Sequence, residues 1–91
     1  MLASANAPPL RIAFPPNGAR VDLGLGRLDT SSLALKAQGG VPPLTWIVNG
    51  APLGTPDLRR QANWTPDGTG FARVSVIDAK GATDSVTVRV E

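Results

Sequence analysis

The residues best suited to chemistry in this chain of 91 residues lie in one short segment, where Arg59 and Arg60 precede Trp64. They include the only adjacent pair of basic residues. An indole that stays partly exposed beside two guanidinium groups can stack on a sugar ring or anchor a partner protein. The competing interpretation is that Trp64 closes one end of the core. The segment therefore predicts a possible contact for glycan or a partner, and it contains no reacting group.

Catalytic patterns are missing from the rest of the chain. Histidine and cysteine are absent, which removes the commonest general base, the commonest transition-metal ligand and any thiolate nucleophile. Ser31 and Ser32 precede Lys36, but neither has a lysine three positions later, as a serine acylase requires. The run Lys80-Gly81-Ala82 is likewise not Lys-Thr-Gly. We expect no enzyme, no catalytic residue, no cofactor and no metal ion.

Two further patterns have structural interpretations. Gly24-Leu25-Gly26 is half of a phosphate-cradling pattern, but a third glycine and a following helix are missing, so it predicts a kinked strand. The acidic residues are spaced too widely for a calcium loop. Asp57, Asp67 and Asp78 fall among turn residues, where we expect their carboxylates to accept hydrogen bonds from local amides.

Charge and hydropathy exclude two classes of partner. The formal net charge is +2, the basic residues are scattered, and tyrosine is absent, which disfavours nucleic-acid binding. No apolar run approaches the roughly 18 residues of a membrane span, and residues 1–7 lack the features of a signal peptide. We expect no membrane contact. Residues 1–9 are small, polar and proline-terminated, so we expect a linker, with one domain over residues 10–91 of a longer protein.

Alternating apolar and polar residues, separated by proline, glycine and asparagine, predict short strands. Val86, Val88 and Val90 alternate with polar residues in the last of them. Asn49-Gly50 favours a two-residue hairpin turn, and Pro52 places the strand after it at a sheet edge. The segment 58–64 is compatible with an edge strand or a single helical turn, and we favour the strand. The other expected strands cover residues 10–14, 21–25, 33–38, 44–48, 51–53, 71–78 and 83–90.

These segments predict an all-β fold. About seven short strands without a helix are typical of an immunoglobulin-like antiparallel β-sandwich, here without a disulfide because the chain has no cysteine. Trp46 lies in the middle of an apolar alternation, so we expect it at the centre of the core.

In this order, the segments resemble the small carboxy-terminal domain of class A penicillin-binding proteins, especially the penicillin-binding protein 1C type. The resemblance covers residues 9–91. The matching motifs are Ile-Ala-Phe-Pro-Pro-Asn-Gly at 12–18, Leu-Ala-Leu-Lys-Ala at 33–37, Leu-Thr-Trp-Ile-Val-Asn-Gly at 44–50, Trp-Thr-Pro at 64–66 with Gly-Phe at 70–71, and Val-Ile-Asp-Ala-Lys-Gly at 76–81.

The resemblance implies a non-catalytic accessory domain of a bifunctional peptidoglycan synthase. In such a parent, a glycosyltransferase and a transpeptidase lie upstream, anchored in the inner membrane, and this domain is periplasmic. The implied partners are peptidoglycan, the transpeptidase domain or a periplasmic protein, contacted through loops and Trp64 or by strand addition at a sheet edge. We expect the isolated domain to be a monomer. The alternative is a structural spacer or adhesin-type immunoglobulin-like module of a bacterial surface protein.

Overall fold

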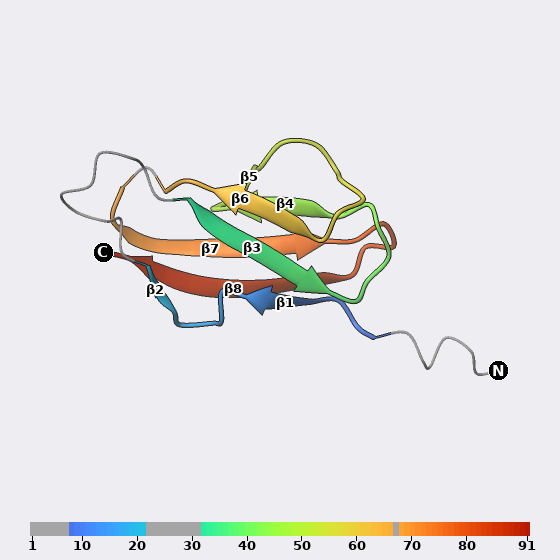
Figure 1. Ribbon diagram of the computed structural model, residues 1–91, viewed down its shortest axis with the longest axis horizontal. Helices are drawn as coiled ribbons and strands as arrows, with labels where there is room; N and C mark the ends of the chain where they lie inside the picture. Colours follow the sequence, from blue (N-terminus) through green and yellow to red (C-terminus); the bar gives the residue numbers. More distant parts are fainter. Residues whose placement is uncertain (1–7, 22–31, 67) are drawn as a thin grey trace.

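The computed structural model describes residues 8–21, 32–66 and 68–91. Two sheets pack face to face in this part of the chain (Figure 1), and none of it forms a helix able to cross a membrane. The predicted all-β sandwich is confirmed. Its strands are β1 (Arg11–Phe14), β2 (Arg20–Val21), β3 (Leu33–Gln38), β4 (Thr45–Val48), β5 (Ala51–Pro52), β6 (Gln61–Trp64), β7 (Gly70–Ile77) and β8 (Thr83–Val90).

The strand order is β1-β3-β6 in the smaller sheet and β2-β8-β7-β4-β5 in the larger one. The antiparallel arrangement is confirmed with one refinement, since β2 runs parallel to β8. The first segment crosses between the sheets at Pro15-Pro16-Asn17-Gly18, because proline cannot donate to a ladder. Beyond the crossing, Gly18 N donates to Thr87 O at 2.7 Å and Arg89 N donates to Ala19 O at 2.8 Å.

The hairpin predicted at Asn49-Gly50 is present, and β7 and β8 form a second one. Asn49 and Gly50 both have positive φ, 52° and 84°, as a two-residue type I′ turn between β4 and β5 requires. β5 is an edge strand, as Pro52 predicts. The β7–β8 turn is held by Asp78, whose carboxylate accepts from the backbone N–H groups of Lys80 and Ala82, both at 2.9 Å.

The core lies between the two sheets. Its residues are the inward positions of the alternating strands, and Trp46 is 4% exposed among them, as predicted. The valines of β8 are buried, which confirms that they lie on the apolar face predicted from their alternation with polar residues. The buried apolar side chains of the core cluster are Leu10, Ile12, Leu35, Ala37, Leu44, Trp46, Val48, Ala72, Val74, Val76, Val86 and Val88.

The segment 58–64 forms a strand only in its second half. β6 covers Gln61–Trp64 and pairs with β3, so the strand interpretation is confirmed there and the helical turn is wrong. Three predictions concern residues outside the described part of the chain: most of the strand at 21–25 with its glycine pair, the turn role of Asp67, and most of the linker at 1–9.

Candidate functional site

The structure separates the three predicted contact residues. The Arg59 guanidinium points to Asp57, with Nη2 3.0 Å from Oδ2. The Arg60 guanidinium points the other way and donates from Nε to Gly39 O at 3.1 Å and from Nη2 to Gly40 O at 3.2 Å. Trp64 lies four residues further along an extended strand, about 13 Å from Arg60 at roughly 3.3 Å per residue. The three side chains therefore do not form one site.

Trp64 is neither fully buried, as a residue that closes the core would be, nor fully exposed, as a free contact residue would be. Its side chain is partly buried and packs against the core, and it lines a hollow beside the β4–β5 turn with Asn49, Ala51 and Thr65. Part of the indole remains accessible there, so the predicted contact with glycan or a partner stays a prediction.

Asp57 and Arg59 form the polar end of a separate pocket of about 270 Å³. Asp57 accepts from the backbone N–H of Arg59 at 3.0 Å, the turn role predicted for it. The side-chain hydrogen bond from Arg59 is the main reason that the pKa of Asp57 lies below its usual range, and the same contact raises the pKa of Arg59. At neutral pH this end of the pocket therefore holds a carboxylate already matched by a cation.

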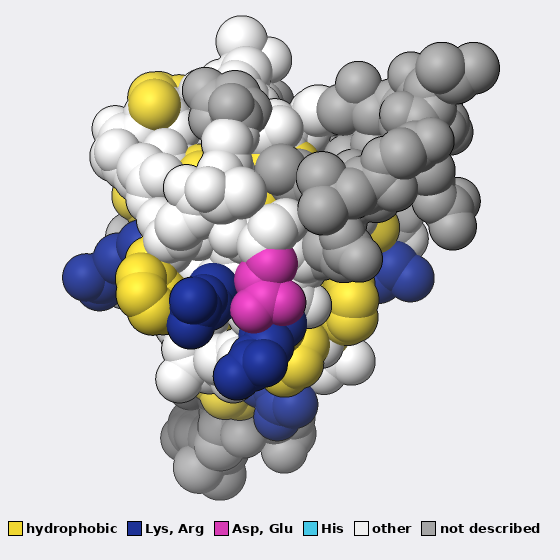
Figure 2. Space-filling view, turned by 90° about the vertical axis from the view of Figure 1, so that its left-hand side faces the viewer, with side chains coloured by type: hydrophobic (Ala, Val, Ile, Leu, Met, Phe, Trp, Pro, Cys, Tyr) yellow, Lys and Arg dark blue, Asp and Glu magenta, His cyan; other side chains and the backbone are white. Residues whose placement is uncertain are grey.

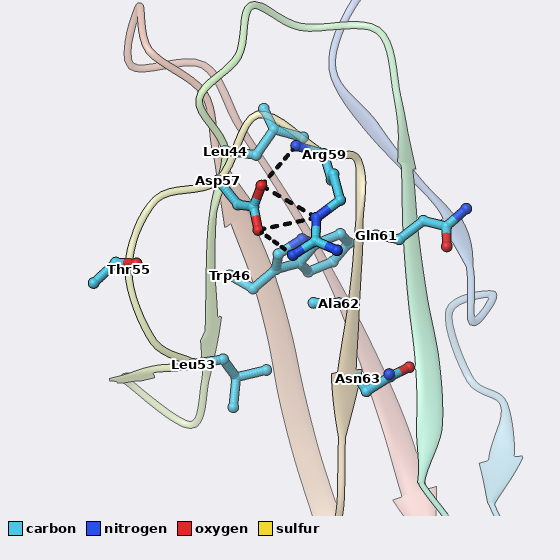
Figure 3. Close-up of a pocket in the computed structure, with 9 residues that line it drawn as sticks. All are labelled: Leu44, Trp46, Leu53, Thr55, Asp57, Arg59, Gln61, Ala62 and Asn63. Carbon is cyan, nitrogen blue, oxygen red and sulfur yellow. Dashed lines mark hydrogen bonds and ion pairs between the residues drawn. The ribbon is translucent and has the colours of Figure 1, made fainter.

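The pocket lies between β6 and the β4–β5 side of the larger sheet (Figure 3). Its lining residues come from the start of β4, from the connection after β5, and from β6. Polar residues of the connection and of β6 mix with four apolar ones. The lining residues are Leu44, Trp46, Leu53, Thr55, Asp57, Arg59, Gln61, Ala62 and Asn63.

Trp46 lines this pocket and belongs to the core cluster. Its Nε1 is buried and has no hydrogen-bond partner among the described residues. An unpaired buried donor costs free energy that a partner would recover. Sequence patterning correctly places Trp46 in the core, but no sequence signal shows that its N–H lacks an acceptor.

The carboxylates of Asp78 and Asp84 hold backbone segments together. Asp78 is buried and accepts from Val41 N at 3.0 Å as well as from its own turn, so its predicted turn role is confirmed and extends to the connection after β3. The bond from Val41 is the main reason that the pKa of Asp78 lies below its usual range. Asp84 Oδ2 accepts from Ile12 N at 2.8 Å and so joins β8 to β1.

A second exposed feature lies at the end of the sandwich shown in Figure 2, where basic side chains surround an acidic one. Phe71 is 73% exposed, and the Arg89 guanidinium lies 5.7 Å from the centre of its ring. Arg20 and Arg89 both approach Glu91 Oε2, at 3.9 and 3.8 Å. No motif in the sequence predicts this patch, although the outward position of Phe71 follows from the alternation of β7.

The arrangement of side chains around the pocket suits the binding of a polar ligand. Within residues 8–21, 32–66 and 68–91, no three His, Cys, Asp or Glu side chains gather as metal ligands would. The pocket is lined by an ion pair and by further polar residues of the connection after β5 and of β6, which are groups that recognise a polar ligand.

The comparisons with known proteins agree with the fold. The model of the penicillin-binding protein C-terminus family matches residues 2–90. Among solved structures, the chain is similar to a fibronectin(III)-like module of CbhA from Clostridium thermocellum, with a TM-score of 0.66 and 18% sequence identity over 90% of this chain and 95% of that chain. At this identity the likeness concerns the fold alone. No curated protein matches the sequence.

Proposed function

The chain belongs to the penicillin-binding protein C-terminus family, and we propose that it is a non-catalytic accessory domain, for binding or scaffolding, of a bifunctional peptidoglycan synthase. The observation that carries the proposal is the family match, which spans nearly the whole chain. The proposed parent supplies the glycosyltransferase and transpeptidase activities and holds this domain in the periplasm. The domain takes part in cell-wall synthesis by contacting peptidoglycan, the transpeptidase domain or a periplasmic protein.

The site chemistry supports a binding role. A catalytic site needs a nucleophile or an acid–base pair with a suitable pKa in a cleft. The carboxylate in the pocket beside β6 has its pKa lowered by Arg59, so it is a weak base and stays ionised at neutral pH. The same pocket and the accessible part of Trp64 offer hydrogen-bond donors and an aromatic surface, which suit recognition of a sugar or a polypeptide.

The test is an amide-shift titration of the ¹⁵N-labelled domain with two probes, soluble disaccharide-peptide fragments of peptidoglycan and the transpeptidase domain of the parent. The two tryptophans give two indole N–H signals, assigned with Trp64→Phe, and these separate the pocket from the Trp64 hollow. We expect shifts at one of these places with at least one probe. A domain that shifts with neither is a spacer, and the binding proposal is then wrong.

A second measurement addresses the absence of catalysis. We expect no covalent labelling of this domain by a fluorescent penicillin, with the transpeptidase domain as the positive control. Labelling of the isolated domain would contradict the proposal, because it would require an acylating residue that the chain was not expected to have.

A further inference from the structure

The free edges of the two sheets differ in how they are protected. β5 is two residues long and contains Pro52, which has no N–H to offer to another strand. The Trp46–Leu53 and Val48–Ala51 pairs are hydrogen-bonded, and Ile47–Pro52 is the non-hydrogen-bonded pair between them. The nitrogen of Pro52 therefore faces away from β4. On β1, the carboxylate of Asp84 occupies the outward N–H of Ile12. β2 has only two residues in the described chain.

β6 has none of these protections. It pairs with β3 on one side, and no described strand pairs with its other side. Its four residues include neither a proline nor a charged side chain. Edge strands in natural proteins usually carry a proline or a charged side chain, because their open backbone groups would otherwise pair with other strands. β6 is therefore the edge most open to strand addition in the part of the chain that the structure describes.

The register identifies the open backbone groups. Ala37 N donates to Arg60 O at 2.9 Å, so residues 60, 62 and 64 direct their backbone groups to β3. Gln61 and Asn63 alternate with them and direct an N–H and a C=O each away from the sheet. The preceding outward N–H, that of Arg59, already bonds to Asp57 at 3.0 Å. The open edge thus begins directly after the Asp57–Arg59 pair.

The pocket beside β6 runs along this edge. Its lining includes Gln61, Ala62 and Asn63, three consecutive residues, whereas a pocket on one face of a strand would be lined by alternate residues. A strand added at β6 would place its inward side chains over this pocket. Trp46, whose buried Nε1 has no acceptor among the described residues, and Arg59 both line it (Figure 3).

We propose that β6 binds an extended polypeptide segment of a partner protein as an added strand, through the backbone groups of Gln61 and Asn63, with a side chain of that segment in the pocket. The inference rests on the proposed binding function and makes it more specific, because it names a polypeptide and not a glycan as the ligand. Affinity comes from the backbone ladder, and the pocket selects the side chain.

The test uses a displayed library of random linear dodecapeptides selected on the unaltered domain alone, after which the enriched peptides are measured on Asn63→Pro. Proline is tolerated where a strand nitrogen faces away from its own ladder, so this variant keeps the β3–β6 bonds and loses only the outward donor. Asn63→Ala is the matched control, because it removes the same side chain and keeps the backbone N–H.

We expect enriched peptides that bind the unaltered domain and Asn63→Ala similarly. They should bind Asn63→Pro about tenfold or more weakly, as expected for a lost hydrogen bond and a blocked ladder. Peptides that bind Asn63→Pro equally well, or a library without enrichment, would overturn the proposal. Binding of peptidoglycan fragments or the transpeptidase domain that Asn63→Pro leaves unchanged would overturn strand addition and leave the binding function standing.

Hydrogen exchange of the unaltered domain gives an answer even if Asn63→Pro does not fold. In the free domain the amides of Gln61 and Asn63 should exchange much faster than that of Ala62, which bonds into β3. A selected peptide should slow Gln61 and Asn63 selectively and shift the indole N–H of Trp46. Peptide binding without added protection at these two amides would refute the strand model.

Discussion

Replacing Asp84 with alanine removes the hydrogen bond that ties the beginning of β1 to β8. The bond joins Ile12 N to Asp84 Oδ2 at 2.8 Å across 72 residues of sequence, and Ile12 is itself a buried core residue. A hydrogen bond to a charged group contributes about 1.5–3 kcal/mol, and its loss leaves the Ile12 N–H without this partner. We expect Asp84→Ala to lower the free energy of unfolding by about that amount.

The conservative control is Asp84→Asn, which keeps an acceptor oxygen and loses the charge. A neutral hydrogen bond contributes about 0.5–1.5 kcal/mol, so we expect this variant to be about 1 kcal/mol less stable than the unaltered domain. For a domain of this size, each kcal/mol shifts Tm by about 4–8 °C. The two variants should therefore be distinguishable in one thermal scan.

Urea unfolding followed by tryptophan fluorescence measures the change, with an unchanged m-value as evidence that the folded and unfolded states are comparable. Amide exchange at Ile12 gives the local result, and it should accelerate more than exchange in β7. An Asp84→Ala variant within about 0.5 kcal/mol of the unaltered domain, with Ile12 still protected, would refute this reasoning.

Three further predictions concern stability. The hydrogen bond from the Val41 N–H is the main reason that the pKa of Asp78 is lowered in the folded state. The stability that Asp78 contributes is therefore present above its unfolded pKa near 3.8 and is lost as the pH falls through its folded pKa. In a plot of Tm against pH, Asp78→Asn should flatten this fall on the acid side. In urea unfolding, Gly40→Ala should lower the free energy of unfolding more than Gly50→Ala. Both glycines have positive φ, but of the two only Gly40 would bring a Cβ atom against the core, with the nearest atom at 2.8 Å. Equal losses of stability in the two variants would contradict this prediction. Leu35→Ala should cost about 2–5 kcal/mol, because Leu35 is fully buried in the central strand of the smaller sheet, and a smaller loss would show that the core relaxes around it.

Local patterns were enough to predict much of the fold. The Asn49-Gly50 turn, the edge position of Pro52 and the inward valines of β8 each depend on one or two residues and their immediate neighbours. The same holds for the turn carboxylates Asp57 and Asp78, whose nearest partners lie two residues away. The ordered motifs also identified the family, which the family model confirms.

Proximity in sequence did not bring the three predicted contact residues together. Arg59, Arg60 and Trp64 are close in the chain, but Arg59 and Arg60 point to different acceptors and an extended strand carries Trp64 away from both. The groups that do meet, Trp46 with Asp57 and Arg59, come from different strands and connections. Their meeting depends on how the two sheets pack, for which no local residue pattern exists.

The sequence by itself determined which residues face the core, where the chain turns, and that the strands form a sandwich, because side-chain period and turn chemistry act over a few residues. The tertiary structure decided which edges are closed and which is open. The Asp84–Ile12 bond, the parallel β2–β8 pairing and the free side of β6 all depend on partners far apart in the chain. Backbone groups are the same in every residue, so only the assembled sheets show which of them are left without a partner.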